Sequence, residues 1–258
     1  MIRFVSILIL CSALLAHAES AADKLTVAGI AEFTDAYRAW DGTRFSAANK
    51  LFREACNEPS ATVTNYYWLG VGEFHRMLQL LGLPANATNQ AAAVSAALEA
   101  SLAALTQAVK LDAGHAESHA LLGTLYGMKI SGNMLSAVWL GPRVGRELKL
   151  ALVAGAGNPR VQYLLGMSRF YTALRTATRR EALTTLLAAE KLFDAEAIVP
   201  QRPLGPRWGH DSCLTFIGLC YEKLDQHADA EKYFRKALVL HPEDGLAQAG
   251  LARVTKSK

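Results

Sequence analysis

Proline is scarce in this sequence of 258 residues, and that scarcity is the first clue to the fold. The chain has eight prolines, and three of them, Pro200, Pro203 and Pro206, fall within one short segment. Because proline interrupts helices and central strands, the remaining stretches can form long regular elements. Alanine and leucine are abundant there, and both favour helix over strand. We therefore expect an all-α protein, with 51% hydrophobic residues available for its core.

A large excess of charge of either sign is also missing. The chain has 27 Lys and Arg against 23 Asp and Glu, and losing Arg3 with an N-terminal signal leaves 26 against 23, a net charge of +3. We interpret these charges as dispersed along the chain. Proteins that bind nucleic acid or anionic membranes carry concentrated basic surfaces. The charge balance therefore gives no argument for either partner.

Cysteine is rare, and Cys56, Cys213 and Cys220 are the three that follow residue 18. An odd number leaves at least one thiol outside any disulfide within the chain. Cys213 and Cys220 lie two helical turns apart, about 10 Å, whereas a disulfide needs Cα atoms within about 7 Å. We expect these thiols to be buried structural residues.

The longest apolar run stands at the N-terminus and is short. It extends from Phe4 to Leu15, follows Arg3, and precedes a small-x-small sequence at residues 16–18, as in a secretory signal peptide. Twelve residues cannot cross a bilayer core of about 30 Å as a helix. We predict a signal peptide at 1–18 and one exported domain at 19–258. The expected location is the periplasm, without stable membrane insertion.

Residues 211–244 contain a recognisable repeat. From Leu214 the sequence reads L-x2-I-G-x2-Y, then A-x3-F-x2-A, and it closes at Pro242. This resembles the tetratricopeptide repeat (TPR), which has a period of about 34 residues and the pattern W-x2-L-G-x2-Y, A-x3-F and proline. Leu214 replaces the usual tryptophan. The small residues let paired helices approach closely, and the large residues fill the space between them.

The spacing of the repeat recurs along the chain. In the family, the first alanine of the second helix precedes the next repeat's glycine by about twenty-two residues. This interval separates Ala48 from Gly70, Ser101 from Gly123, and Val144 from Gly166. The resemblance implies a right-handed α-solenoid of about five antiparallel helix pairs and a C-terminal capping helix. The expected pairs are 29–59, 61–113, 115–157, 159–198 and 210–242, and the cap is 244–255. The alternative is a generic helical bundle with one true repeat at its end.

Two insertions interrupt the regular spacing. One lies inside the second pair, at 76–100, and the other is the proline-containing loop at 194–209. Insertions in a solenoid normally form loops at its edges. Either insertion could instead fold over the concave face and bury it.

No pattern of catalytic or metal-binding residues stands out. His115 and His119 have the i, i+4 spacing of two metal ligands, but the zinc-protease order H-E-x-x-H is absent, and we expect His119 to pack inward. Residues 207–213 include Cys, His, Asp and Ser, but local crowding does not make a triad. There we expect Asp211 or Ser212 to cap a helix and Trp208 to pin the loop. We predict no enzyme activity, cofactor or metal; a hydrolase or metalloenzyme is the weakest hypothesis.

The TPR resemblance implies a concave partner-binding groove. Family positions on the first helix of each pair map to aromatic, methionine and charged residues, which suit a peptide or a partner helix. They do not match the clamp of two lysines and two asparagines that holds chaperone carboxylates. The predicted groove residues are Tyr67, Phe74, Glu117, Met128, Arg160, Tyr163, Met167, Phe170 and Tyr171.

Two functions fit this groove. The first is a non-catalytic exported scaffold or adaptor that binds a protein or peptide partner and assists an envelope complex. The alternative is a small-ligand-binding accessory component of a transport or secretion system. A small ligand needs an enclosed pocket of about 300 to 1,000 Å³, whereas a peptide site stays open along several repeats.

Overall fold

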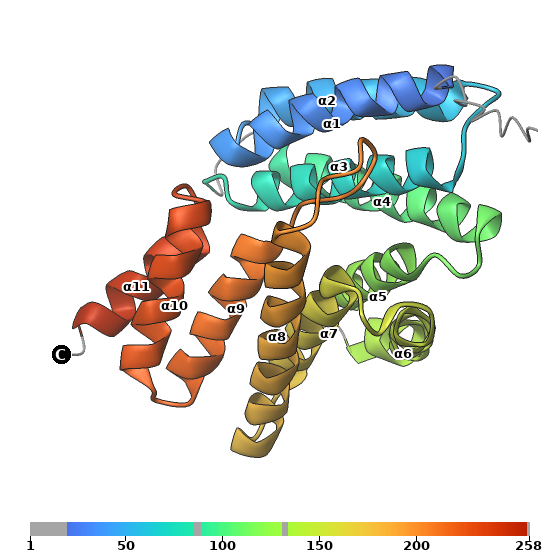
Figure 1. The fold of residues 1–258 in the computed structure, drawn as a ribbon. Helices are drawn as coiled ribbons and strands as arrows, with labels where there is room; N and C mark the ends of the chain where they lie inside the picture. Colours follow the sequence, from blue (N-terminus) through green and yellow to red (C-terminus); the bar gives the residue numbers. More distant parts are fainter. Residues whose placement is uncertain (1–19, 85–88, 131–133, 257–258) are drawn as a thin grey trace, which may run out of the picture.

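The computed structural model describes residues 20–84, 89–130 and 134–256. The predicted signal peptide at 1–18 lies outside these residues. The described part of the chain is all helical, with eleven helices and no strand. Figure 1 shows the helices stacked in pairs from the N-terminus to the C-terminus.

The five predicted helix pairs and the capping helix are present. The two helices of each pair pack against each other, and neighbouring pairs pack together. The helices are α1 Ala21–Ala39, α2 Gly42–Asn57, α3 Val63–Leu81, α4 Gln90–Leu111, α5 Ala116–Ile130, α6 Met134–Gly155, α7 Pro159–Thr172, α8 Thr176–Ala197, α9 His210–Lys223, α10 His227–Leu240 and α11 Gly245–Lys256. The final helix, α11, packs on α9 and α10, as expected for a cap.

Local sequence fixes several helix starts. Ser20 and Asp41 accept hydrogen bonds from the first backbone N–H groups of α1 and α2, at 3.0 and 2.7 Å. Asn158 does the same for α7 at 2.9 Å, and Pro159 follows it at the first helical position. These contacts satisfy backbone donors that have no partner within the helix.

The glycines that mark the repeat are points of close helix contact. A methyl group built on Gly70 would lie 2.5 Å from the Leu105 side chain, and one on Gly218 would lie 2.7 Å from the Phe234 ring. Both contacts join the two helices of one pair. The same kind of contact recurs in the third and fourth pairs, where Gly123 and Gly166 face the side chains of Leu148 and Leu186.

We expect Gly70→Ala to lower the free energy of unfolding by about 1–3 kcal/mol, since the added methyl overpacks the α3–α4 contact. Chemical denaturation at neutral pH measures the change. Gly127→Ala is the matched control, because nothing lies within 4 Å of a Cβ at that helical position. The control should be neutral or slightly stabilising. Equal losses in both variants would contradict the packing role of Gly70.

The insertion in the second pair lengthens its helices. α3 continues to Leu81, and α4 begins at Gln90 and has 22 residues. By length and composition alone, α4 could cross a membrane, and the absence of stable membrane insertion stays a prediction. α4 packs against α3 and α5, and Leu102 and Leu105 on it are buried.

The loop at residues 198–209 folds back onto the first two pairs. In Figure 1 it is the orange segment that runs from α8 across α3 towards α1 before α9 begins. Trp68 donates a hydrogen bond from Nε1 to the Leu204 carbonyl at 2.9 Å. Trp208 is 3% exposed, and its ring lies 5.2 Å from that of His75. The loop therefore covers part of the concave layer.

The first and fifth pairs are also joined directly. The Tyr37 hydroxyl, near the end of α1, donates to the Asp211 carboxylate in the first turn of α9 at 2.8 Å. His241, after α10, donates from Nδ1 to the same carboxylate at 3.1 Å. Burial acts to lower the pKa of His241, but the Asp211 carboxylate outweighs it and raises that pKa. These bonds tie together the two ends of the stack.

Candidate partner-binding surface

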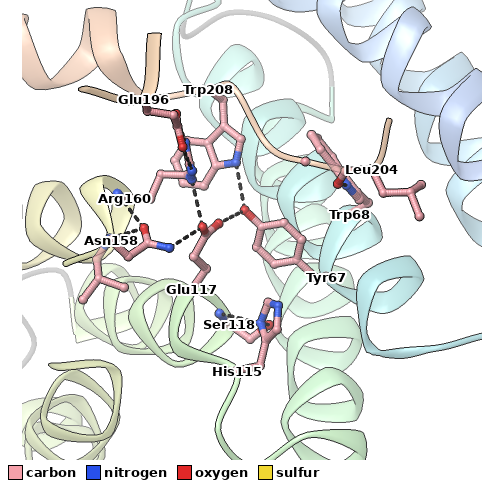
Figure 2. Close-up of polar contacts among 12 residues, drawn as sticks. Tyr67, Trp68, His115, Glu117, Ser118, Asn158, Arg160, Glu196, Leu204 and Trp208 are labelled. Atoms are coloured by element: carbon pink, nitrogen blue, oxygen red, sulfur yellow. Dashed lines mark hydrogen bonds and ion pairs between the residues drawn. The ribbon is translucent and has the colours of Figure 1, made fainter. Parts of the chain in front are cut away.

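A buried polar cluster centred on Glu117 occupies part of the predicted groove. Asn158 Nδ2 and Arg160 Nε donate to Glu117 Oε1 at 2.7 and 3.0 Å. The Tyr67 hydroxyl donates to the other carboxylate oxygen. Glu117 is 7% exposed, so this carboxylate is held almost entirely by protein donors. Figure 2 shows the donors converging on it from three sides.

The cluster extends from Arg160 to the covering loop. Arg160 donates from its terminal nitrogens to Glu196, with one bond of 3.0 Å. Trp208 donates from Nε1 to the Tyr67 hydroxyl at 3.0 Å. Arg207 in the loop donates to backbone carbonyls at Glu196 and Val199. Side chains from α3, α5, α7, α8 and the loop are thereby linked (Figure 2).

The electrostatics of the cluster are those of a structural ion network. Burial and the Glu117 carboxylate raise the pKa of Tyr67 well above its usual value, so its hydroxyl stays a proton donor. Burial acts to lower the pKa of Arg160, but Glu117 and Glu196 outweigh it and raise that pKa. Arg160 therefore keeps its charge although it is 3% exposed.

Most predicted groove residues lie inside the molecule. Tyr67, Phe74, Glu117, Arg160, Tyr163 and Met167 are buried. Met128 and Phe170 are half-buried, and Tyr171 is 69% exposed. The covering loop accounts for the burial of the Tyr67 and Phe74 region, where Trp208 packs. Partner binding through the predicted set stays a prediction, and its accessible members are Met128, Phe170 and Tyr171.

Half-buried Phe170 and exposed Tyr171 and Leu174 form a patch together with the buried ring of Phe216, and we name these four residues the aromatic end. The rings of Phe170 and Tyr171 lie 5.5 and 5.7 Å from that of Phe216, both edge to face. Phe216 is buried beneath them, and Leu174 is 89% exposed. An exposed apolar patch on a rigid aromatic base is typical of a protein-binding surface.

Two hollows lie outside the aromatic end. One, of about 100 Å³, lies between α1 and the covering loop, and half of the residues that line it are aromatic, including Phe33, Trp68 and Trp208. The other, of about 510 Å³, is an open depression along α10 beside Lys232 and Val239. The first is smaller than a typical ligand site, and the second is not enclosed.

The two histidines singled out in the sequence have separate protein partners. His119 is buried, and its Nδ1 lies 2.6 Å from Glu147 on α6. His115 Nδ1 lies 2.8 Å from the Ser118 hydroxyl. Within residues 20–84, 89–130 and 134–256, no group of three or more His, Cys, Asp or Glu is placed to hold a metal ion.

The polar residues in the first turn of α9 also serve the fold. The N-cap of α9 is Gly209, with no side-chain cap, so the expectation that Asp211 or Ser212 caps this helix was wrong. The buried Asp211 carboxylate instead accepts hydrogen bonds from the side chains of Tyr37 and His241. Cys213 is a free, buried thiol whose pKa is raised by burial, so it is a poor nucleophile.

Part of the Glu117 cluster carried a signal in the sequence. Glu117 and Arg160 each stand six residues before the marker glycine of their pair, so they occupy equivalent positions in adjacent repeats. Equivalent positions stack side by side in a solenoid, which places opposite charges together. Glu196 and Trp208 had no such signal in the sequence. Trp208 reaches the cluster through the covering loop, which lies outside the repeat pattern.

A family profile described as "Tetratricopeptide repeat" matches residues 212–244. The chain contains a tetratricopeptide repeat. The profile covers the same segment as the best repeat found in the sequence, and the helix pairs before it have the TPR arrangement. Proteins with this fold generally act as non-catalytic scaffolds that bind protein or peptide partners. Comparison with curated protein sequences gives no match.

Solved structures support the TPR fold over most of the chain. A TPR protein from Thermus thermophilus is 15% identical, with 91% of this chain and 99% of that chain covered and a TM-score of 0.63. A chain of the Cut9–Hcn1 hetero-tetramer of the APC/C is 16% identical, with 93% and 37% covered and a TM-score of 0.62. The HusA haemophore from Porphyromonas gingivalis is 18% identical, with 81% and 96% covered and a TM-score of 0.54. At these identities the likeness shows the fold alone.

Proposed function

We propose that this protein is an exported, non-catalytic scaffold that binds a protein or peptide partner through the aromatic end. The observation that carries the proposal is that Tyr171, 69% exposed, packs edge to face on the buried ring of Phe216, with Leu174, 89% exposed, three residues further along the chain. The Glu117 cluster and the covering loop close off another part of the concave layer. The accessible part of the predicted groove on α7, Phe170 and Tyr171, belongs to the aromatic end.

The geometry of the aromatic end suits binding. Phe170 and Tyr171 pack edge to face at 5.5 Å, so little side-chain freedom is lost when a partner docks. Aromatic side chains provide much of the binding energy at protein interfaces. Arg175 and Arg180 lie exposed in the adjoining turn and first turns of α8, where they can add polar contacts at the rim.

The N-terminal sequence supports the proposed place of action. The expected signal peptide at residues 1–18 supports export across the inner membrane to the periplasm. The TPR fold supports a role in holding other proteins together there. We therefore infer that the scaffold assists an envelope complex.

The small-ligand alternative has weaker support. One structural neighbour is described as a haemophore, but the likeness is one of fold. The hollow between α1 and the covering loop is about 100 Å³, below the range of about 300 to 1,000 Å³ for small-molecule sites. Saturable binding of a small aromatic compound that Trp208→Ala abolishes would favour the alternative.

The double change Tyr171→Ser and Leu174→Ser should weaken partner capture by roughly tenfold or more, because it removes the exposed anchors. Crosslinking in the native envelope, followed by purification of the chain and its adducts, measures capture. Val239→Ser is the control, since Val239 is 81% exposed on α10, away from the aromatic end. Unchanged adducts in the double variant would place the binding site elsewhere.

A further inference from the structure

The outer face of α6 is an exposed surface that the partner-binding proposal does not use. α6 packs mainly on α5, and Figure 1 shows it nearly end-on at the edge of the stack. Val138, Trp139 and Val153 on this helix are 71%, 78% and 80% exposed. Their spacing places them on one side of the helix. We name this side, with Leu150 included, the α6 face.

Basic residues accompany the apolar ones on α6. Arg143, Arg146 and Lys149 are exposed, and Arg143 lies over the Tyr126 ring at 5.9 Å. Glu147, the acidic residue of α6, is 4% exposed and is paired with His119 and Arg146. The exposed side of α6 therefore carries positive charge, whereas the Glu147 carboxylate lies inside the protein.

The charge bias extends well beyond this helix. Between Ser118 and Arg180 the sequence has nine Lys and Arg and one Asp or Glu, a local net charge of 9 − 1 = +8 in a chain of net charge +4. One of the nine, Arg160, is buried between Glu117 and Glu196 and adds no charge to the surface. The interpretation of the charges as dispersed was therefore wrong for this region. The near-neutral total conceals a basic segment that includes α6 and α7.

We propose that the α6 face docks on an anionic lipid membrane surface. Apolar residues with tryptophan on one side of a helix, accompanied by exposed basic residues, have the composition of interfacial helices that lie on membranes. Positive side chains are attracted to anionic headgroups, and the apolar side chains enter the boundary between headgroups and acyl chains.

The shape of the face favours lipid over a protein partner. Val138, Trp139 and Val153 project into solvent, because each of them is more than 70% exposed. A protein would need a complementary hollow for each of them. A headgroup layer accommodates projecting side chains without one. Docking would hold the scaffold at a membrane while the aromatic end binds its partner.

The test is sedimentation of the full chain, as exported by its host, with vesicles of equal parts phosphatidylcholine and phosphatidylglycerol. The chain should sediment with these vesicles and not with pure phosphatidylcholine, and added salt should weaken binding by screening the charges. Tryptophan fluorescence should shift to shorter wavelength on binding, because Trp139 is 78% exposed, whereas Trp40 is half-buried and Trp68 and Trp208 are buried.

Two double variants separate the apolar and basic contributions. Val138→Ser with Trp139→Ser, and Arg143→Gln with Lys149→Gln, should each reduce vesicle binding by roughly tenfold or more. Val239→Ser should bind like the parent. All of these proteins share the same N-terminus, so any binding by residues before 20 cancels in the comparison.

Failure of the parent chain to bind the mixed vesicles would overturn the proposal. So would parental binding by both double variants, or equal binding to pure phosphatidylcholine. Crosslinking from position 139 to an acidic protein, without vesicle binding, would assign the face to a protein partner instead. Thermal melting of the variants should match the parent because the replaced side chains are exposed.

Discussion

Replacing Arg160 with methionine should lower the free energy of unfolding by about 3–5 kcal/mol. Arg160 is the cation between Glu117 and Glu196, and its removal leaves negative charge in the interior without a counter-charge. Breaking a buried ion pair costs more than breaking an exposed one, because the remaining charge has lost its hydration. Urea denaturation at neutral pH measures the loss.

Two further variants give this prediction its controls. Adding Glu117→Gln to Arg160→Met should recover part of the lost stability, since the orphaned charge is removed. Arg44→Met breaks the exposed pair with Asp35, whose side chains are 48% and 51% exposed, and should cost less than about 1 kcal/mol. A loss for Arg160→Met no larger than that for Arg44→Met would contradict the structural role of the cluster.

Replacing Trp208 with alanine should cost about 3–5 kcal/mol and release the covering loop. The ring is 3% exposed and packs near Phe74 and His75 while its Nε1 binds Tyr67. Its loss leaves a cavity in the aromatic core and a buried hydroxyl without its donor. Chemical denaturation gives the stability, and hydrogen exchange of residues 198–209 reports the release.

Trp139→Ala is the matched control for Trp208→Ala. It removes the same side chain from an exposed position on α6, where the ring is 78% accessible. The expected change in stability is within about 0.5 kcal/mol, as for most surface substitutions. Comparable losses at the two positions would mean that the loop does not rest on Trp208 in solution.

The fold was largely predictable because its signal is repeated and local. Gly70, Gly123, Gly166 and Gly218 each mark the place where one helix packs closely on its partner. The interval of twenty-two residues that precedes Gly70, Gly123 and Gly166 made these positions recognisable in the sequence. Helix caps such as Asn158 followed by Pro159 are readable in the sequence for the same reason. The insertions changed helix lengths without changing the order of the pairs.

The surface was less predictable because its accessibility depends on long-range contacts. Trp68 donates a hydrogen bond to the carbonyl of Leu204, and Trp208 donates one to the Tyr67 hydroxyl. The partners are separated by 136 and 141 residues in the sequence. No periodic pattern encodes these contacts. Glu117 and Arg160 were assigned to a groove because their repeat positions suit one, yet their opposite charges at equivalent positions favour the internal pair that the structure has.

The central claim is that the covering loop makes the Tyr67 region of the concave layer internal and leaves the aromatic end accessible. Hydroxyl-radical footprinting of the unmodified chain tests this most directly, because it labels side chains according to their contact with solvent. The structure predicts rapid labelling of Tyr171 and strong protection of Tyr67, Phe74 and Trp208. Labelling of Tyr67 and Trp208 at rates similar to that of Tyr171 would contradict the claim and favour the open groove predicted from the sequence.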